Sequence, residues 1–362
     1  MSNITLRIDG VDYTNWLSAS VDMDVRTLAW GFSASVTTPV EQPQALDVKK
    51  GDRVEVRYQE HVVLTGYVDA VSASHDAQNV SLSLSGRSLT GQLTDSSAVY
   101  EGGQFDNLSL SRIAEILCEP FGIDVQNIIP EAGPGILQTQ YLEDAPFDVV
   151  RIEQGESVFE LLERLARQRG VLLTTNAQGA LVITRAGTTL VTPALRLGVN
   201  IKAANGLDGL QQRASQYIIK GSTNGGLKWN TDQASGNAIV VYDRSVPLYR
   251  PRIVVCESEL SAENARARGQ WQRCRDLGED VIENTTVTGW DNSEGYWQPN
   301  RLVYVDNPLL GINGERLIVA VTLTEGDDGE LCELTTQPPE ALVITEEQAS
   351  EEALAWQTNS TQ

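Results

Sequence analysis

Apolar and polar residues alternate along several short stretches of the first 97 residues, and this alternation is typical of half-buried β-strands. Residues 4–8 and 53–57 alternate strictly, and residues 62–68 form a longer apolar run, with Gly, Asp and Asn between the stretches. Short strands at this spacing indicate a small barrel or sandwich. We therefore predict a first β-barrel module over residues 1–97, completed by residues at about 188–215.

After Tyr100 the apolar period changes to that of a helix. Ser109 precedes residues 110, 113, 114 and 117, which share one helical face. Ser157 stands three residues before Glu160, which is the spacing of a capping box, and Gly170 can end this second helix. A strand, a turn and a second strand follow over residues 171–184. These features predict a compact α/β insertion over residues 98–187.

Strand patterns resume at residues 215–220, and a helix is predicted over residues 261–277, closed by Gly278. The order of turn, strand, long apolar strand and strand in residues 51–84 returns in residues 299–335. We predict a second β-barrel module over residues 216–337, with helix 261–277 in it, and an acidic C-terminal tail over residues 338–362. The predicted fold class is mainly β with an α+β insertion, as two tube-like β-barrel modules plus a small α/β domain.

Acidic residues outnumber basic ones by 49 to 27, which gives a formal net charge of −22. Nucleic-acid affinity comes largely from Lys and Arg that neutralise phosphates, so sequence-specific nucleic-acid binding is not expected. The same charge suits a wall along which DNA passes without adhering, and it equally suits a surface that only aids solubility. No run of 18 apolar residues occurs, so stable membrane insertion is not expected.

Residues with catalytic potential are sparse. The chain has two histidines, and its four cysteines lie far apart with no CxxC spacing. No nucleophile elbow, P-loop or dinucleotide fingerprint is present. Close carboxylates such as Glu153 with Glu156, or Asp291 with Glu294, are expected by composition alone in so acidic a chain. We predict that the protein is not an enzyme and has no catalytic, cofactor-binding or metal-binding residues.

Candidate partner-binding residues are a set of arginines on the helix predicted over residues 261–277, together with one tryptophan. The arginines could meet an acidic neighbouring subunit, or they could form a solvated face balanced by nearby acids. The tryptophan could anchor an interface, although core packing is the commoner role of such a residue. The set is Arg266, Arg268, Arg273, Arg275 and Trp297.

Several stretches, in the same order along almost the whole chain, together resemble the baseplate hub protein of Mu-like contractile phage tails, the phage tail protein P family. More distantly they resemble the T4-like hub and the hub part of type VI secretion spikes. The chain departs from the family where Phe105 stands in place of Trp, and residues 222–237 and those after 338 match little. The matching stretches are residues 64–69, 85–88 with Leu93 and Asp95, 102–105, 169–177, 215–217 with 220–221, 249–251, the helix after Ser261, and Trp297 with 299–300.

The resemblance implies a non-enzymatic homotrimer whose two modules per subunit form a pseudo-sixfold ring around a DNA channel. It implies that this ring joins the tail tube protein to the central spike protein, contacts other baseplate proteins, and resides in the virion after assembly in the host cytoplasm. A second hypothesis is the hub of a tailocin or a type VI-like secretion particle. A third, of another class, is a cell-wall glycan binder or hydrolase that uses the tryptophans and carboxylates.

Overall fold

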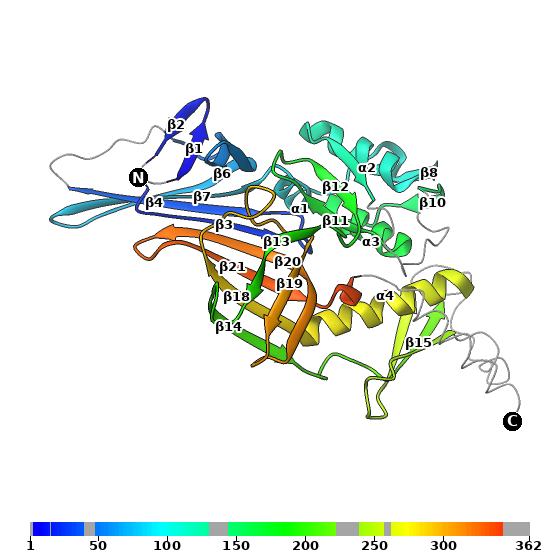
Figure 1. The fold of residues 1–362 in the computed structure, drawn as a ribbon. Coiled ribbons are helices and arrows are strands. Elements are labelled where there is room, and N and C mark those ends of the chain that lie inside the picture. Colours follow the sequence, from blue (N-terminus) through cyan, green and yellow to red (C-terminus); the bar gives the residue numbers. More distant parts are fainter. Residues whose placement is uncertain are drawn as a thin grey trace, which may run out of the picture.

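We describe the fold from a computed structural model, which covers residues 3–14, 16–39, 48–129, 144–221, 239–256 and 262–342. The chain is mainly β with a few helices, as the sequence predicts, and Figure 1 shows one large sheet with smaller helical parts attached. The predicted C-terminal tail lies outside the described residues after Leu342. Residues 222–237, which match the family little and were expected to form an exposed loop, also lie outside them.

A 13-stranded sheet forms the body of the molecule and joins two sets of strands that lie far apart in the chain. The two sets meet where β20 pairs with β3. The first set is β1 (Ile4–Ile8), β2 (Val11–Tyr13), β3 (Ser18–Asp24), β4 (Gly31–Pro39), β5 (Arg53–Tyr58), β6 (His61–His75) and β7 (Asn79–Ser88). The second set is β13 (Leu190–Arg196), β14 (Ile201–Asp208), β18 (Val281–Thr288), β19 (Arg301–Asn307), β20 (Ile312–Gly326) and β21 (Gly329–Gln337).

The two sets repeat one pattern of strand pairing. In the first, antiparallel pairs run in the order β5, β6, β7, β4, β3. In the second, they run in the order β19, β20, β21, β18, β14. The long strands β6 and β20 each have 15 residues. The repeat that the sequence pattern suggested is thus present in the hydrogen-bonded ladder.

The repeat differs at one end. The β5–β6 connection is the polar pair Gln59 and Glu60, whereas the β19–β20 connection is the longer, apolar segment 308–311. Leu309 in that segment is 81% exposed. The two sets of strands therefore present different tips at corresponding positions.

Both sets of strands share one apolar core. Val54, Val56 and Leu84 from the first set and Val305, Val321 and Leu334 from the second belong to the same buried cluster. Trp290 and Trp297 also lie in this core, so large aromatic side chains fill the space between the two sets.

Residues 90–185 form a separate unit with its own core of leucine, isoleucine and valine side chains. The capping box of the second predicted helix is present, because the Glu160 N–H donates to Ser157 Oγ at 3.1 Å and the Ser157 N–H donates to Glu160 Oε2 at 2.8 Å. Gly170 ends that helix with a φ of 61°. The elements are α1 (Gly91–Asp95), η1 (Glu101–Gly103), β8 (Gln104–Leu108), α2 (Leu110–Cys118), η2 (Glu119–Phe121), β9 (Val125–Ile128), β10 (Phe147–Arg151), α3 (Val158–Arg169), β11 (Leu172–Thr175) and β12 (Leu181–Thr184).

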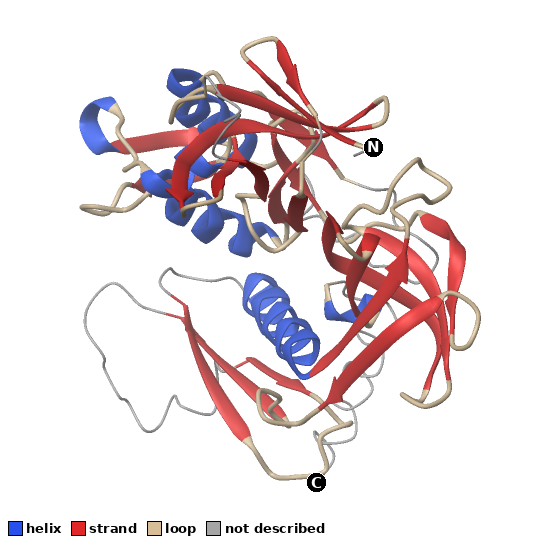
Figure 2. Cartoon of the chain, turned by 90° about the vertical axis from the view of Figure 1, so that its left-hand side faces the viewer, coloured by secondary structure: helices blue, strands red, loops and turns tan. Residues whose placement is uncertain are grey.

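A second small unit consists of a three-stranded sheet and the longest helix. The order β16, β15, β17 is formed by β15 (Gln216–Gly221), β16 (Ile239–Tyr242) and β17 (Pro251–Cys256), and α4 (Ala262–Asp280) packs on it. Figure 2 shows α4 lying across these strands. The short helix η4 (Pro339–Ala341) follows the last strand.

The hydrogen bonds differ from the expected grouping of strands in two places. Residues 188–215 were expected to complete the first module, but β13 and β14 pair with β19 and β18 of the second. Residues 216–256 were expected in the second module, but β15, β16 and β17 pair only with one another among the described strands. Neither difference could be predicted from nearby residues, because the pairing partner of a strand depends on the whole fold. The domain boundaries at 97, 187 and 337 stay a proposal.

Helix α4 also differs from its prediction, because it continues through Gly278 to Asp280. Gln337 Nε2 donates to the Gly278 carbonyl at 2.6 Å, and a Cβ atom at Gly278 would lie 2.8 Å from Gln337 Oε1. This glycine therefore gives room for close packing and does not end the helix.

Candidate interaction surfaces

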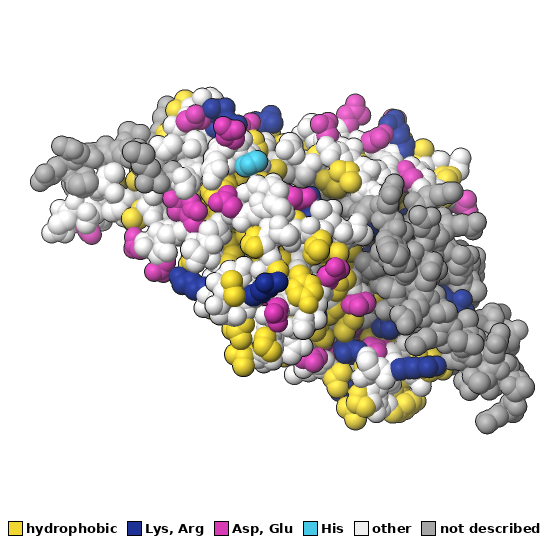
Figure 3. Space-filling view, viewed as in Figure 1, with side chains coloured by type: hydrophobic (Ala, Val, Ile, Leu, Met, Phe, Trp, Pro, Cys, Tyr) yellow, Lys and Arg dark blue, Asp and Glu magenta, His cyan; other side chains and the backbone are white. Residues whose placement is uncertain are grey.

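The side of the large sheet that faces away from the core carries mostly small hydroxyl side chains. Rows of residues cross β20, β3, β4 and β7 on this side. One row contains Thr324, Ser20, Ser33 and Ser85; the next contains Ser18, Ser35, Ser83 and Ser72; a third contains Thr37, Ser81 and Ser74. We call these residues the hydroxyl face. Figure 3 shows that the end of the molecule where β4 and β7 run has few charged side chains.

Several hydroxyls of this face bond to one another or to neighbouring polar groups. Ser18 Oγ lies 2.7 Å from Ser35 Oγ, and Thr37 Oγ1 lies 3.1 Å from Ser81 Oγ. Thr322 Oγ1, in the adjoining row, donates to Asp22 Oδ1 at 2.8 Å. Because strand side chains alternate between faces, this arrangement requires a small polar residue at every second position.

Charges at the margin of the hydroxyl face do not favour phosphate binding. The adjoining row contains Glu333, Asp22 and Arg87. The guanidinium of Arg87 pairs with Asp69 and with Asp95, each at 2.6 Å. Arg87 is thus already neutralised by two carboxylates and is not free to bind a phosphate.

The candidate arginines of α4 do not form one open patch. Arg266 is exposed, whereas Arg268 is partly buried, with its guanidinium 4.7 Å from the Trp271 ring centre. Arg275 is exposed and pairs with Glu279 at 3.1 Å. Arg273 lines a pocket beside Asp243 and Glu340, and its Nε is buried without a hydrogen-bond partner. The structure therefore leaves Arg266 and Arg275 as the exposed members of the predicted set.

Trp297 is not available for contact with a partner in this fold. Its side chain is 2% exposed and belongs to the core shared by both sets of strands. The expectation that it anchors an interface is wrong, because the turn before β19 directs the indole inward. Trp290, one of the tryptophans that a glycan binder could use, is 1% exposed. Trp229 and Trp356 lie outside the described residues.

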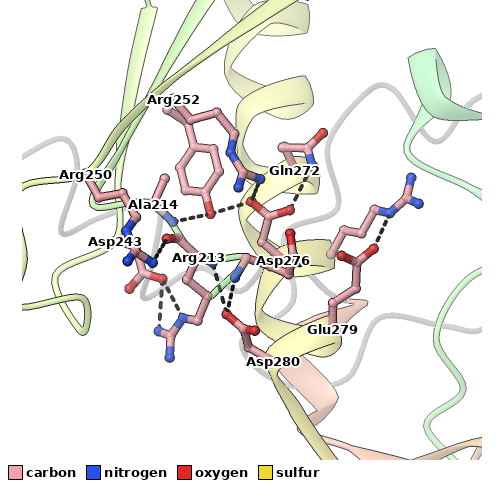
Figure 4. A network of polar contacts seen from close by, with 12 residues as sticks. Arg213, Ala214, Asp243, Arg250, Arg252, Gln272, Asp276, Glu279 and Asp280 are labelled. Carbon is pink, nitrogen blue, oxygen red and sulfur yellow. Dashed lines mark hydrogen bonds and ion pairs between the residues drawn. The ribbon is translucent and has the colours of Figure 1, made fainter. Parts of the chain in front are cut away.

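A buried polar network fixes the second half of α4 to the three-stranded sheet (Figure 4). Asp276 Oδ2 accepts hydrogen bonds from the Tyr217 hydroxyl at 2.8 Å and from Arg252 Nη1 at 2.6 Å. Its Oδ1 accepts from Gln272 Nε2 at 2.9 Å. Burial raises the pKa of the Asp276 carboxyl above its usual value, and the Arg252 guanidinium opposes this shift.

A second acid at the end of α4 binds the chain before β15. Asp280 Oδ2 accepts from the backbone N–H groups of Gln212 and Arg213 at 2.8 and 3.0 Å. The Arg213 guanidinium in turn pairs with Asp243 at 2.9 Å. Asp280, one of the acids expected to balance the arginines of this helix, is thus a structural contact of the small unit.

We next consider the metal ligands and carboxylates among the described residues. No cluster of three or more His, Cys, Asp or Glu side chains there could hold a metal ion. Three of the four carboxylates considered as glycosidase pairs have structural partners, since Glu156 pairs with Arg164 at 2.9 Å and Glu294 with Arg301 at 2.6 Å. Asp291 accepts from the Tyr58 hydroxyl at 3.2 Å. Within the same residues, no helix is long and apolar enough to cross a membrane.

The sequence analysis missed the hydroxyl face, although a signal for it exists. Residues 79–88 read NVSLSLSGRS, and residues 31–38 read GFSASVTT, with Ser or Thr at alternating positions. Such strands predict a polar side made of small residues instead of the usual long charged ones.

Three family models match the chain in order. The N-terminal model of the Mu phage baseplate assembly protein GpP-like family covers residues 3–88. The second-domain model of the baseplate hub protein gp44-like family covers residues 90–185. The fourth-domain model of the Mu phage baseplate assembly protein GpP covers residues 261–345.

Relatives and solved structures agree with these models. The baseplate hub protein gp44 of Escherichia phage Mu is 32% identical over 355 residues, which are 95% of this chain and 90% of that protein. The 43 kDa tail protein of prophage MuSo2 from Shewanella oneidensis is 36% identical, with a TM-score of 0.82 over 94% of this chain and 99% of that one. A tail protein from Neisseria meningitidis MC58, 21% identical, shares the fold with a TM-score of 0.76 over 93% and 98% of the two chains.

These matches, with the duplicated strand pattern, define a class: structural proteins of phage tail baseplates. The chain belongs to the baseplate hub protein family of Mu-like phages. The fold is also shared, at 15% identity and a TM-score of 0.57 over 94% of this chain and 78% of that one, by an Escherichia coli component of the type VI secretion system.

Proposed function

We propose that the chain forms a homotrimeric, pseudo-sixfold ring that encloses a DNA channel and joins the tail tube to the central spike. The observation that carries this proposal is the repeated strand pairing, because three copies with two similar modules each present six similar units. Such a ring matches a hexameric tube on one side and a trimeric spike on the other. Assembly takes place in the host cytoplasm, and other baseplate proteins bind around the ring.

The first test is the mass of the purified protein in solution. Light scattering over a concentration series is expected to approach three times the monomer mass of 39.5 kDa. We also propose that the exposed arginines of α4 bind an acidic neighbour, so Arg266→Glu weakens assembly in the same experiment without lowering the melting temperature. A strict monomer at every concentration, also with spike and tube proteins added, contradicts the ring.

We propose that the hydroxyl face lines the channel. A triple variant with Ser20→Lys, Ser33→Lys and Ser85→Lys would then place cations along the DNA path. The assembled variant is expected to retain linear duplex DNA, with the salt dependence of log K steeper by about 0.9 per phosphate neutralised. Fluorescence anisotropy at several salt concentrations measures this slope.

Two controls separate a channel from an ordinary basic surface. The matched variant with Gln at the same three positions has similar bulk and no charge, so it is expected to retain no DNA. A closed circular duplex of the same sequence cannot thread a closed ring, and it is expected to bind the lysine variant much more weakly than the linear form. Equal binding of linear and circular DNA places the face on an outer surface and contradicts the proposal.

A further inference from the structure

Within one chain, the two sets of strands are joined where β3 pairs with β20. This pairing provides a template for how two chains could be joined. The first half of β20 pairs with β19, and its second half, from Ala320 to Glu325, pairs along the same edge with β3. Ser20 lies opposite Thr324, and Val21 lies opposite Leu323. One long strand thus belongs to the ladders of both sets.

In the repeated strand pattern, β6 of the first set corresponds to β20 of the second, residue by residue. The β6–β7 ladder has a register shift between Val68 and Ala70, and the β20–β21 ladder has one between Ile318 and Ala320. Aligning the two shifts sets Ala70 on Ala320 and therefore Ser74 on Thr324. The β-bulge at the same place in both long strands fixes this correspondence without relying on sequence identity.

In the same way, β14 of the second set corresponds to β3 of the first. Ser20 lies opposite Ser33, which lies opposite Ser85 in β7. In the second set Asn205 lies opposite Asn284, which lies opposite Thr335 in β21. Because Ser85 and Thr335 follow the two aligned register shifts, Asn205 corresponds to Ser20.

The corresponding edges are open within one chain. On the side of β6 away from β7, the first half pairs with β5, and no described strand pairs with residues 69–75. All seven of these residues are exposed. On the side of β14 away from β18, no described strand pairs either, and all but its first residue are exposed.

We propose that β14 of one copy pairs antiparallel with the second half of β6 in the next copy, as β3 pairs with β20 within the chain. Asn205 then lies opposite Ser74 of the next copy, Gly206 opposite Ala73 and Leu207 opposite Ser72. This inference rests on the proposed ring and names the strands that close it. An open strand edge is a ready template for pairing with another chain, and the second copy supplies the matching edge.

Burial and side-chain direction agree with this register. Val71 is 40% exposed, whereas its counterpart Val321 is fully buried beside β3. Ser72 and Ser74 lie on the hydroxyl face, as does Thr324, and Thr322 lies on the same side in the adjoining row. The proposed joint therefore covers Val71, with Asp208 opposite it, and places Asn205 and Leu207 in line with Ser74 and Ser72 of the next copy. A one-residue slip would reverse both faces.

The hydrogen-bond phase selects positions for a cross-link. The Val25 N–H donates to the Val319 carbonyl at 2.9 Å, so bonded pairs along β3 and β20 alternate from this pair and leave Ser20 and Thr324 as a non-hydrogen-bonded pair. Residues in such pairs have Cα atoms about 4.5 Å apart, with close side chains. In the proposed pairing, Asn205 and Ser74 of the next copy form the corresponding non-hydrogen-bonded pair.

The test is disulfide formation in the full chain with Asn205→Cys and Ser74→Cys. Within one copy these residues are at opposite ends of eight consecutive strands, on the order of 30 Å apart, so a bond between them joins two copies. Mild oxidation is expected to give a reducible ladder that ends at three chains. Leu207→Cys with Ser72→Cys is a second pair expected to do the same.

The matched control is Asn205→Cys with His75→Cys, which moves one thiol by one residue and to the other face. It is expected to cross-link about tenfold more slowly or not at all, because its Cβ atoms point apart. Single variants and the unchanged chain control for the native cysteines, of which Cys118, Cys274 and Cys332 are buried. A trimer in which the control pair cross-links as fast as the two test pairs, or in which no pair cross-links, overturns this register and leaves the ring in place. Absence of any trimer overturns both proposals.

Discussion

Replacing Asp276 by alanine is expected to lower the free energy of unfolding by about 2–4 kcal/mol, because it leaves the buried Tyr217 hydroxyl without its acceptor and removes the partner of the Arg252 guanidinium, whose side chain is 35% exposed. The carboxylate is 2% exposed and also accepts from the Tyr217 hydroxyl, so one change removes contacts from α4 to two strands. Urea unfolding followed by circular dichroism measures the loss.

Glu279→Ala is the matched control on the same helix. Its ion pair with Arg275 is exposed on both sides, so its loss is expected to change stability by no more than about 0.5 kcal/mol. If the two variants unfold at the same urea concentration, Asp276 is not the contact that fixes α4 to the sheet.

The second large effect is expected at Gly86, one residue of the stretch 85–88 that pointed to the family. A Cβ atom there would lie 2.0 Å from the Tyr67 carbonyl oxygen and 2.5 Å from the Phe32 ring. Since a backbone atom cannot move aside alone, Gly86→Ala is expected to cost about 3 kcal/mol or more, or to prevent folding. Soluble yield and urea unfolding measure this.

Gly314→Ala provides the comparison, because this glycine also lies in a long strand but has nothing within 4 Å of an added Cβ. It is expected to leave stability almost unchanged. A similar loss in both variants would show that chain flexibility, and not close packing, accounts for the effect at Gly86.

The sequence predicted those features that depend on residues close together in the chain. The capping box at Ser157 and Glu160, the left-handed Gly170 and the following strand pair are all present, because each depends on residues a few positions apart. The repeat of strand order also survived, because it is a pattern of short-range alternation. These features fixed the fold class and supported the resemblance to the hub family.

What could not be predicted depends on partners far along the chain. Nothing near Leu190 indicates that β13 pairs in parallel with β19, more than a hundred residues later. Trp297 reads as an interface anchor until the fold encloses it, and Gly278 reads as a helix end until Gln337 occupies the space beside it. The exposure of the arginines of α4 could not be predicted either, because Arg273 lines a pocket together with residues from other parts of the chain.

The two unequal tips, Gln59 with Glu60 and the segment around Leu309, have a consequence for evolution. In a ring of six identical chains, any substitution appears six times, so every position around the rim changes together. In the proposed ring of three chains with two related modules each, a substitution in one module changes three alternate rim positions and spares the other three. Divergence between the two modules would thus let the proposed ring retain sixfold regularity where it is needed and discard it at the rim.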